Sequence, residues 1–215
     1  MTVASDPCSA DTVGPRPFAG DAADFPAVAV WRSSERERLR SARQRLSVAE
    51  RSVIDAELTR HLDAALQDRL AQPGVVLSGY WPIKGEPDLR PWFAKLHEAG
   101  VAVAMPVVHQ RAVPLIFRLW HPALAMERGH WNIPVPPDFA EQVMPDITLA
   151  PLVGWDMDRY RLGYGGGYFD RTLGAADPRP FAVGIGFQAA RLPTIHPQPH
   201  DIPMNLIVTE AGVQC

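Results

Sequence analysis

Apolar positions along the chain follow two spacings, and the changes between them mark the expected elements. Between Ser33 and Leu70 the apolar residues recur at helical spacing. Ser47 followed by Glu50 forms a capping box, so we expect a first helix to end before Ser47 and a second to begin there. Pro73-Gly74 ends the second helix. Its predicted buried face consists of Ile54, Leu58, Leu62, Ala65, Leu66 and Leu70.

Short apolar runs follow, and they alternate with further helical patterns. The runs that resemble strands cover residues 75–77, 101–108, 115–120, 147–153, 181–187 and 206–209. We expect a helix from Pro87 to Ala99, with Gly100 past its end, and another through Leu173. This alternation predicts an α/β protein, a single three-layer domain with a mostly parallel central sheet flanked by helices.

The N-terminal residues are expected to differ from the rest. Residues 1–30 are rich in Pro, Gly, Ser and Asp, which predicts a flexible tail. They lack a basic start followed by an apolar run, so we do not expect a secretory signal. Order is expected to begin near Trp31, and the α/β domain then covers residues 31–215.

Charge and composition exclude several classes of partner. The chain of 215 residues carries 24 acidic and 21 basic residues, a net charge of -3, which argues against a nucleic-acid or membrane-surface partner. All the basic residues except Lys84 and Lys95 are arginines, and no apolar run approaches the ~20 residues of a membrane span. Cys8 and Cys215 stand at opposite ends and without metal-ligand spacing, so we expect a reducing, cytoplasmic location. Any anion that binds must therefore be held by a local arrangement.

One glycine-rich segment, RLGYGGGYFDR at residues 161–171, is the most informative candidate for such an arrangement. Its four glycines, Gly163, Gly165, Gly166 and Gly167, are expected to turn with positive φ and to let a ligand approach the backbone. Successive N–H groups beside a helix N-terminus form an anion nest that suits phosphate. The segment matches neither a P-loop nor the dinucleotide fingerprint. A glycine-rich surface turn is the alternative, but the flanking arginines, tyrosines and carboxylate favour phosphate binding.

A run of arginines on the first helix is a second candidate anion site. Arg36, Arg40 and Arg43 share one helical face. On spacing alone, a solvated face paired with Glu35 and Glu37 is the favoured interpretation of the run.

The segment from Tyr80 to Asp88 follows a strand, where open α/β sheets bind ligands. Trp81 could cover a flat ring, and Glu86 could accept hydrogen bonds from ring nitrogens. An ordinary strand-to-helix loop, with Asp88 as a helix cap, is the alternative.

The remaining titratable residues indicate less. Three prolines keep His196 and His200 off a common helical face, and the other histidines are scattered. No nucleophile–base grouping is visible, and we assign no catalytic residue. Asp170 and Asp201 could together hold Mg²⁺, which prefers carboxylates, waters and phosphate oxygens.

Taken together, these segments resemble the 5-formyltetrahydrofolate cyclo-ligase family. RLGYGGGYFDR is similar to that family's RLGYGGGYYDR signature, with Phe169 for the second tyrosine, and YWPIKGEPDL is similar to its Y-x-P-x-x-x-E-V-D-T segment. AMPVV, HDIPMNLIVTE and RERLRSARQRLS match in kind and order, with Arg36 where lysine is usual. The resemblance covers residues 35–213.

The resemblance implies an enzyme that uses ATP and Mg²⁺ to close 5-formyltetrahydrofolate into 5,10-methenyltetrahydrofolate, with release of ADP and phosphate. The ATP-binding residues that it implies are Arg36, Arg40, Arg161, Gly163, Tyr164, Gly165, Gly166, Gly167 and Tyr168. The folate-binding residues that it implies are Trp81, Glu86, Tyr164 and Tyr168, and the metal ligands are Asp170 and Asp201. The implied partner is a reduced folate, and we expect a monomer or weak dimer.

Departures from the family pattern leave two alternatives. Trp131-Asn-Ile-Pro-Val-Pro136 stands where Gly-Ile-x-Glu-Pro is usual, so Val135 replaces a carboxylate, and Pro87 replaces the valine after Glu86. Residues 115–117 also depart from the usual Met-x-Phe pattern. An ATP-using relative that acts on another formyl- or amide-bearing heterocycle is one alternative, and a non-catalytic folate- or nucleotide-binding protein is the other.

Overall fold

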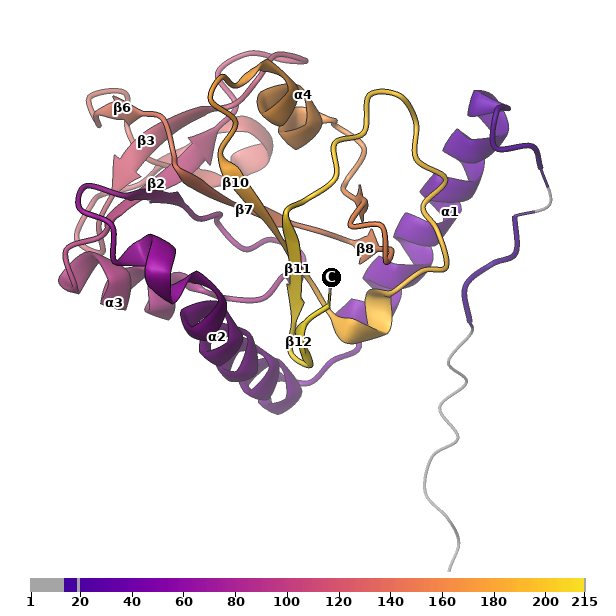
Figure 1. Ribbon diagram of the computed structural model, residues 1–215, viewed down its shortest axis with the longest axis horizontal. Coiled ribbons are helices and arrows are strands. Elements are labelled where there is room, and N and C mark those ends of the chain that lie inside the picture. Colours follow the sequence, from indigo (N-terminus) through magenta and orange to yellow (C-terminus); the bar gives the residue numbers. More distant parts are fainter. Residues whose placement is uncertain (1–13, 19, 215) are drawn as a thin grey trace, which may run out of the picture.

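An eight-stranded sheet forms the centre of the molecule (Figure 1). The computed structural model describes residues 14–18 and 20–214. Five neighbouring strands are parallel: β11 (Leu206–Thr209), β10 (Phe181–Ile185), β7 (Ile147–Pro151), β1 (Val76–Ser78) and β2 (Ala102–Val107). Antiparallel strands extend the two edges: β12 (Gly212–Val213) beyond β11, then β3 (Ile116–Trp120) and β6 (Gln142–Val143) beyond β2. The mostly parallel sheet predicted from the sequence is therefore confirmed.

Helices cover both faces of this sheet, which makes the domain three-layered as predicted. The helices are α1 (Phe25–Gln44), α2 (Val48–Leu70), α3 (Arg90–Glu98) and α4 (Tyr168–Ala175). Figure 1 shows α2 and α3 below the sheet and α4 above it. Side chains alternate between the two faces of a strand. Leu149 accordingly packs into the cluster with Leu62 of α2, while Ala150 packs into the cluster with Leu173 of α4 and Leu39 of α1.

Short elements complete the chain and build the surroundings of the site. Two small antiparallel pairs lie outside the main sheet: β4 (Glu127–Arg128) with β5 (Pro134–Val135), and β8 (Gly154–Trp155) with β9 (Arg161–Leu162). Two 3₁₀ turns are η1 (His130–Asn132) and η2 (Gln188–Ala190). Residues 191–214, the described part of the chain after η2, contain four prolines and no helix, so His196 and His200 do not share a helical face, as the sequence predicts. No helix among the described residues is long and apolar enough to cross a membrane.

The break between the first two helices lies where the capping box predicts it. α1 ends at Gln44 and α2 begins at Val48. The Ser47 hydroxyl accepts a hydrogen bond from the Glu50 N–H at 3.2 Å, and the Glu50 carboxylate accepts one from the Ser47 N–H at 2.7 Å. Each interaction satisfies an amide that the helix start leaves free.

The N-terminal boundary is wrong in the sequence prediction. α1 begins at Phe25, before the expected start of order near Trp31, because Asp24 caps it and Pro26 suits the first turn. The flexible tail was predicted for residues 1–30, and residues 1–13 of it lie outside the described part of the chain. Within the described part, Arg16 and Phe18 contact α1.

Candidate functional site

A cavity lies at the edge of the sheet where the parallel strands β1, β2 and β7 end, the place where open α/β sheets bind ligands. Pro106 and Pro151 of β2 and β7 form part of its wall. The predicted site residues that line it are Arg36, Trp81, Glu86, Arg161, Gly163, Tyr164, Gly165, Gly166, Gly167, Tyr168, Asp170 and Asp201. Arg40 is the one predicted site residue outside the lining. The fold thus brings segments that are far apart in sequence around a single cavity.

The glycine segment, residues 161–171, runs from β9 into α4 along this cavity. Only Gly165 (φ +95°) and Gly167 (φ +63°) adopt the positive φ predicted for all four glycines. Gly163 and Gly166 are required for space instead, because a Cβ would lie 2.8 Å from Arg161 Nη1 at Gly163 and 2.9 Å from the Tyr168 ring at Gly166. Gly167 precedes α4 and gives no side-chain cap, so the first amides of the helix are left for a ligand.

Two arginines place positive charge beside these amides. Arg36 of α1 donates from Nε to the Gly163 carbonyl at 2.7 Å. Arg161 of β9 is buried, with 8% of its surface exposed. Burial lowers the pKa of both guanidinium groups, and the neighbouring Arg32 lowers that of Arg36 further. An anion bound beside these two desolvated guanidinium groups would favour their charged forms.

Arg40 lies behind the cavity wall and not in it. Its guanidinium carbon stands 5.6 Å from the centre of the Tyr164 ring, and its buried Nε has no hydrogen-bond partner. Arg43, also on α1, donates to the Tyr164 hydroxyl and to the Lys84 carbonyl, the latter at 3.1 Å. The arginine run is therefore divided: Arg36 faces the cavity, while Arg40 and Arg43 fix the Tyr164 ring from behind. It is not the solvated face that the spacing alone allowed.

Glu86 contributes an unsatisfied carboxyl oxygen to the lining of the cavity. Its Oε2 accepts from the Ile83 N–H at 2.9 Å, while its Oε1 is buried without a partner. Burial raises the pKa of Glu86 to about 7, against the opposing effects of the Ile83 hydrogen bond, Arg43 and Tyr164. Burial, together with the Glu86 charge, also raises the pKa of Tyr164 to about 12. A buried acceptor or donor of this kind suits the N–H groups or nitrogens of a flat heterocycle.

Aromatic side chains form much of the remaining wall. Trp81 lines the cavity and carries the Arg90 guanidinium 4.8 Å from the centre of its ring. Trp131 of η1 lies edge-on to Tyr168, with 5.9 Å between ring centres, and is 62% exposed. Its backbone has a positive φ of 55°, which is rare for a bulky residue and holds the indole at the cavity. The walls therefore suit a planar ring, whereas the glycine segment suits a phosphate.

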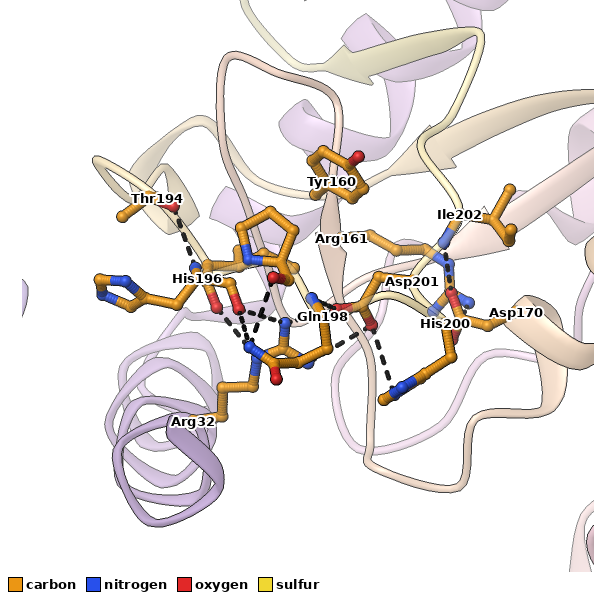
Figure 2. Close-up of polar contacts among 12 residues, drawn as sticks. Arg32, Tyr160, Arg161, Asp170, Thr194, His196, Gln198, His200, Asp201 and Ile202 are labelled. Carbon is orange, nitrogen blue, oxygen red and sulfur yellow. Dashed lines mark hydrogen bonds and ion pairs between the residues drawn. The ribbon is translucent and has the colours of Figure 1, made fainter. Parts of the chain in front are cut away.

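The two predicted metal ligands lie together beside the glycine segment. Asp170 of α4 accepts from the Ile202 N–H at 3.3 Å, which places it next to Asp201, and Figure 2 shows both carboxylates with their arginines. Asp170 pairs with Arg161 at 2.9 Å, and Asp201 pairs with Arg32 at 2.5 Å.

This donor set fits Mg²⁺ only in combination with a nucleotide. Mg²⁺ at nucleotide sites takes one or two carboxylates and completes its shell with phosphate oxygens and water. Among the described residues no group of three or more His, Cys, Asp or Glu side chains could hold a metal. Asp170 and Asp201 would hold an ion that arrives with phosphate.

Several residues of the site were missed by sequence reasoning. Arg32, Trp131 and His200 line the cavity, and Arg43, which was considered only for its helical face, fixes Tyr164. Arg32 lies one turn before Arg36 on the same face of α1, so the helical spacing could have found it had the helix start been recognised. Nothing in the spacing of His200 indicates its position, because the loop that carries it is irregular.

Val135, the departure that suggested a different substrate, does not line the cavity. It is buried in β5 and packs toward Gly129, where a Cβ would lie 2.9 Å from Val135 Cγ1. Its neighbours Ile133 and Pro134 do line the cavity. Val135 itself therefore forms no part of the cavity wall.

An α/β domain whose cavity combines an anion nest with aromatic side chains defines a protein that binds a nucleotide or phosphate together with a flat heterocycle. The match to known families is more specific. The chain belongs to the 5-formyltetrahydrofolate cyclo-ligase family, whose family model matches residues 28–210.

Two bacterial cyclo-ligases that are similar in sequence support this assignment. A 5-formyltetrahydrofolate cyclo-ligase from Escherichia coli (strain K12) is 32% identical over 135 residues, covering 60% of this chain and 74% of the relative. One from Haemophilus influenzae is 26% identical over 179 residues, covering 80% and 94%.

Solved structures agree with the fold. The 5,10-methenyltetrahydrofolate synthetase of Aquifex aeolicus has a TM-score of 0.72 and 28% identity, covering 85% of this chain and 91% of that one. The Mycoplasma pneumoniae synthetase has a TM-score of 0.67 and 23% identity, covering 83% and 98%, and supports the fold alone.

Proposed function

We propose that the protein is a 5-formyltetrahydrofolate cyclo-ligase, which uses ATP to convert 5-formyltetrahydrofolate into 5,10-methenyltetrahydrofolate. The observation that carries the proposal is one cavity whose lining combines the glycine segment, Arg36 and Arg161 with Trp131 and Glu86, whose Oε1 is unsatisfied. Membership of the family supports both the reaction class and the two ligands.

The proposed reaction needs alignment and charge stabilisation more than a protein nucleophile. The formyl oxygen attacks the γ-phosphorus of ATP, and the bond to ADP breaks. N10 of the folate then attacks the activated carbon, the carbon–oxygen bond breaks, and the N10 proton and the oxygen leave with phosphate. Reactions of this type gain most from fixed donors around the developing charge. A site without a nucleophile–base pair is consistent with this chemistry.

Each wall has a part in this proposal. Arg36, Arg161 and the free amides of the glycine segment would hold the phosphates and stabilise the charge on the transferred group. Tyr164, fixed by Arg43, would separate the phosphate side from the ring side. Trp81, Trp131 and Tyr168 would contact the reduced folate ring, and Glu86 would bind its nitrogens. Arg40 would act indirectly, by holding the Tyr164 ring in place.

Mg²⁺ belongs to the proposal as the ion that accompanies ATP, and when bound it neutralises phosphate charge. Asp170 and Asp201 would hold it, and in the structure their charges are balanced by Arg161 and Arg32. A cytoplasmic location and a monomer or weak dimer stay predictions.

The proposal can be tested with the purified protein, ATP, Mg²⁺ and 5-formyltetrahydrofolate. Formation of the methenyl product is followed by its absorbance, and ADP is measured in the same sample. We expect one ADP for each product molecule. Trp131→Ala, compared with the conservative Trp131→Phe, should raise KM for the folate, because the exposed indole forms part of the aromatic wall of the cavity. ADP release that does not depend on the folate would refute the proposal.

A further inference from the structure

The loop from Ile195 to Asp201 carries a cavity residue without any regular backbone structure to hold it. It has no helix or strand hydrogen bonds, and His196 has a positive φ of 53°. Asp201 nevertheless lines the cavity and is only 9% exposed in its side chain. Loops of this kind sample several conformations unless side chains fix them. Something outside the loop must therefore hold it.

Arg32 of α1 holds this loop at three points (Figure 2). Its Nε donates to the Ile195 carbonyl at 2.9 Å and its Nη2 to the His196 carbonyl at 2.9 Å. Nη1 and Nη2 donate to the Asp201 carboxylate at 3.3 and 2.5 Å. Asp201 in turn accepts from the Gln198 N–H at 2.6 Å, which closes the loop on itself. A guanidinium can satisfy all these acceptors at once because its donors are fixed in one plane, which an ammonium group cannot do.

A segment before α1, Gly14–Phe18, fastens the same helix and the same loop. The Arg16 carbonyl accepts from Trp31 Nε1 at 2.9 Å, and the Arg16 N–H donates to Glu35 Oε1 at 3.1 Å. The Phe18 ring stands 4.4 Å from the His196 ring and 6.1 Å from the Trp31 ring, measured between centres.

Trp31 and His196 are themselves 4.8 Å apart, edge to face. Three aromatic rings, from the segment, the helix and the loop, are thus packed together directly beside the Arg32 contacts. The family match begins at residue 28, so Gly14–Phe18 lies outside the region shared with the family.

We propose that Arg32 is a positioning residue and Gly14–Phe18 a strap, which together hold the Ile195–Asp201 loop so that Asp201 faces the phosphate side of the cavity. The proposal rests on the proposed function for the identity of the ligand at that side. Phe18 does not line the cavity, so a change there can reach a ligand only indirectly, through His196 of the loop or Trp31 of α1, and exchange at the loop amides shows which part responds. Without the strap, the loop exchanges among conformations, and fewer molecules present Asp201 correctly at any time.

The experiment compares Phe18→Ala with Phe25→Ala, an exposed phenylalanine at the start of the same helix. Hydrogen exchange at the Gln198 and Ile202 amides reports on the loop directly, because these amides donate to Asp201 and Asp170. We expect faster exchange at both amides in Phe18→Ala and not in Phe25→Ala. We also expect about a 10-fold rise in KM for Mg·ATP, the usual effect of removing a group that orients a ligand-binding carboxylate, with KM for the folate unchanged.

Two further variants keep the test decisive if one protein folds poorly. Arg32→Lys keeps a positive charge beside Asp201 but cannot satisfy both carbonyls, so its exchange rates should fall between those of the wild type and Arg32→Ala. A truncation that removes residues 1–18 should behave as Phe18→Ala does, and one that removes residues 1–13 serves as its control.

The exchange rates separate this proposal from the proposed function. Unchanged exchange at Gln198 and Ile202 in Phe18→Ala and in the longer truncation would overturn the strap, whatever the enzyme activity is. An equal rise in KM for both substrates would also overturn it, because a general loss of structure would then explain the change. Faster exchange with weaker binding of Mg·ADP, measured by calorimetry, would support the strap even if the protein did not cyclise the folate.

Discussion

Glu86→Gln should make the protein more stable at alkaline pH, although Glu86 is placed in the binding site. The carboxyl is 7% exposed, and burial raises its pKa from 4.5 to about 7. Glutamine keeps the shape and can still accept the hydrogen bond from the Ile83 N–H, but it never ionises. The variant therefore removes the cost of a buried charge and leaves the packing intact.

The size of the effect follows from the two pKa values. Below pH 4.5 the carboxyl is neutral in the folded and the unfolded chain, so its ionisation contributes nothing to stability. Between pH 4.5 and about 7 the unfolded chain releases the proton while the folded protein keeps it, so the free energy of unfolding decreases as pH rises. Above about pH 7 the full penalty is present, and a shift of this size corresponds to roughly 3 kcal/mol.

The assay is urea unfolding of wild type and Glu86→Gln at acidic and alkaline pH. We expect the advantage of the variant to grow by roughly 3 kcal/mol between the two conditions. Other titrating groups, including Asp55 with its pKa raised by burial to about 6, are the same in both proteins and cancel. Glu57→Gln is the control, because hydrogen bonding to Arg60 lowers the pKa of Glu57 and the variant should gain nothing at alkaline pH. Parallel pH curves for wild type and Glu86→Gln would refute the reasoning.

Three other substitutions test separate parts of the structure. Gly165→Ala places a side chain at φ +95°, so it should lower the free energy of unfolding by about 1–3 kcal/mol and weaken ADP binding in a titration. Gly174→Ala, in α4 with open space around it, should instead raise the free energy of unfolding by about 0.5–1 kcal/mol. Asp170→Asn should raise the Mg²⁺ concentration that the reaction needs and leave KM for the folate unchanged in steady-state kinetics; a normal Mg²⁺ dependence would remove Asp170 from the metal site. Asp156→Ala leaves the buried Ile195 amide and the partly buried Tyr160 amide without their acceptor and should cost about 2–4 kcal/mol in urea unfolding, and a smaller loss would mean that water replaces the carboxylate.

The sheet and its helices could be predicted because local pattern and tertiary packing agree. The run at residues 147–153 is apolar except for Thr148, as is typical of a strand covered on both faces, and its first five residues form the central strand β7. The capping box at Ser47 identified the start of α2 for a similar reason, since its two hydrogen bonds depend only on neighbouring residues.

The start of α1 could not be predicted in this way. Residues 25–32 carry few polar positions, and the side chains that they bury contact residues far along the chain, such as Arg32 with Ile195 and Asp201. Helical spacing does not show such long-range contacts. The flexible tail was expected from composition, and composition does not predict that the Phe18 ring packs against Trp31 and His196.

The site was predictable to the extent that its residues belong to compact motifs. The glycine segment and Glu86 lie in recognisable stretches, and the structure brings them to one cavity. The different roles of Arg36, Arg40 and Arg43 were not predictable, because residues that share a helical face can still point to different neighbours. Their partners separate them: Arg36 binds the Gly163 carbonyl, whereas Arg40 and Arg43 contact Tyr164.

The central claim is that one cavity binds ATP and 5-formyltetrahydrofolate together and catalyses their reaction. Its most direct test is the appearance of methenyl absorbance when the purified protein is given both substrates with Mg²⁺. We predict that product and ADP form in equal amounts, and that omission of either substrate abolishes both. Absence of the methenyl product, under conditions in which the Escherichia coli relative forms it, would contradict the claim.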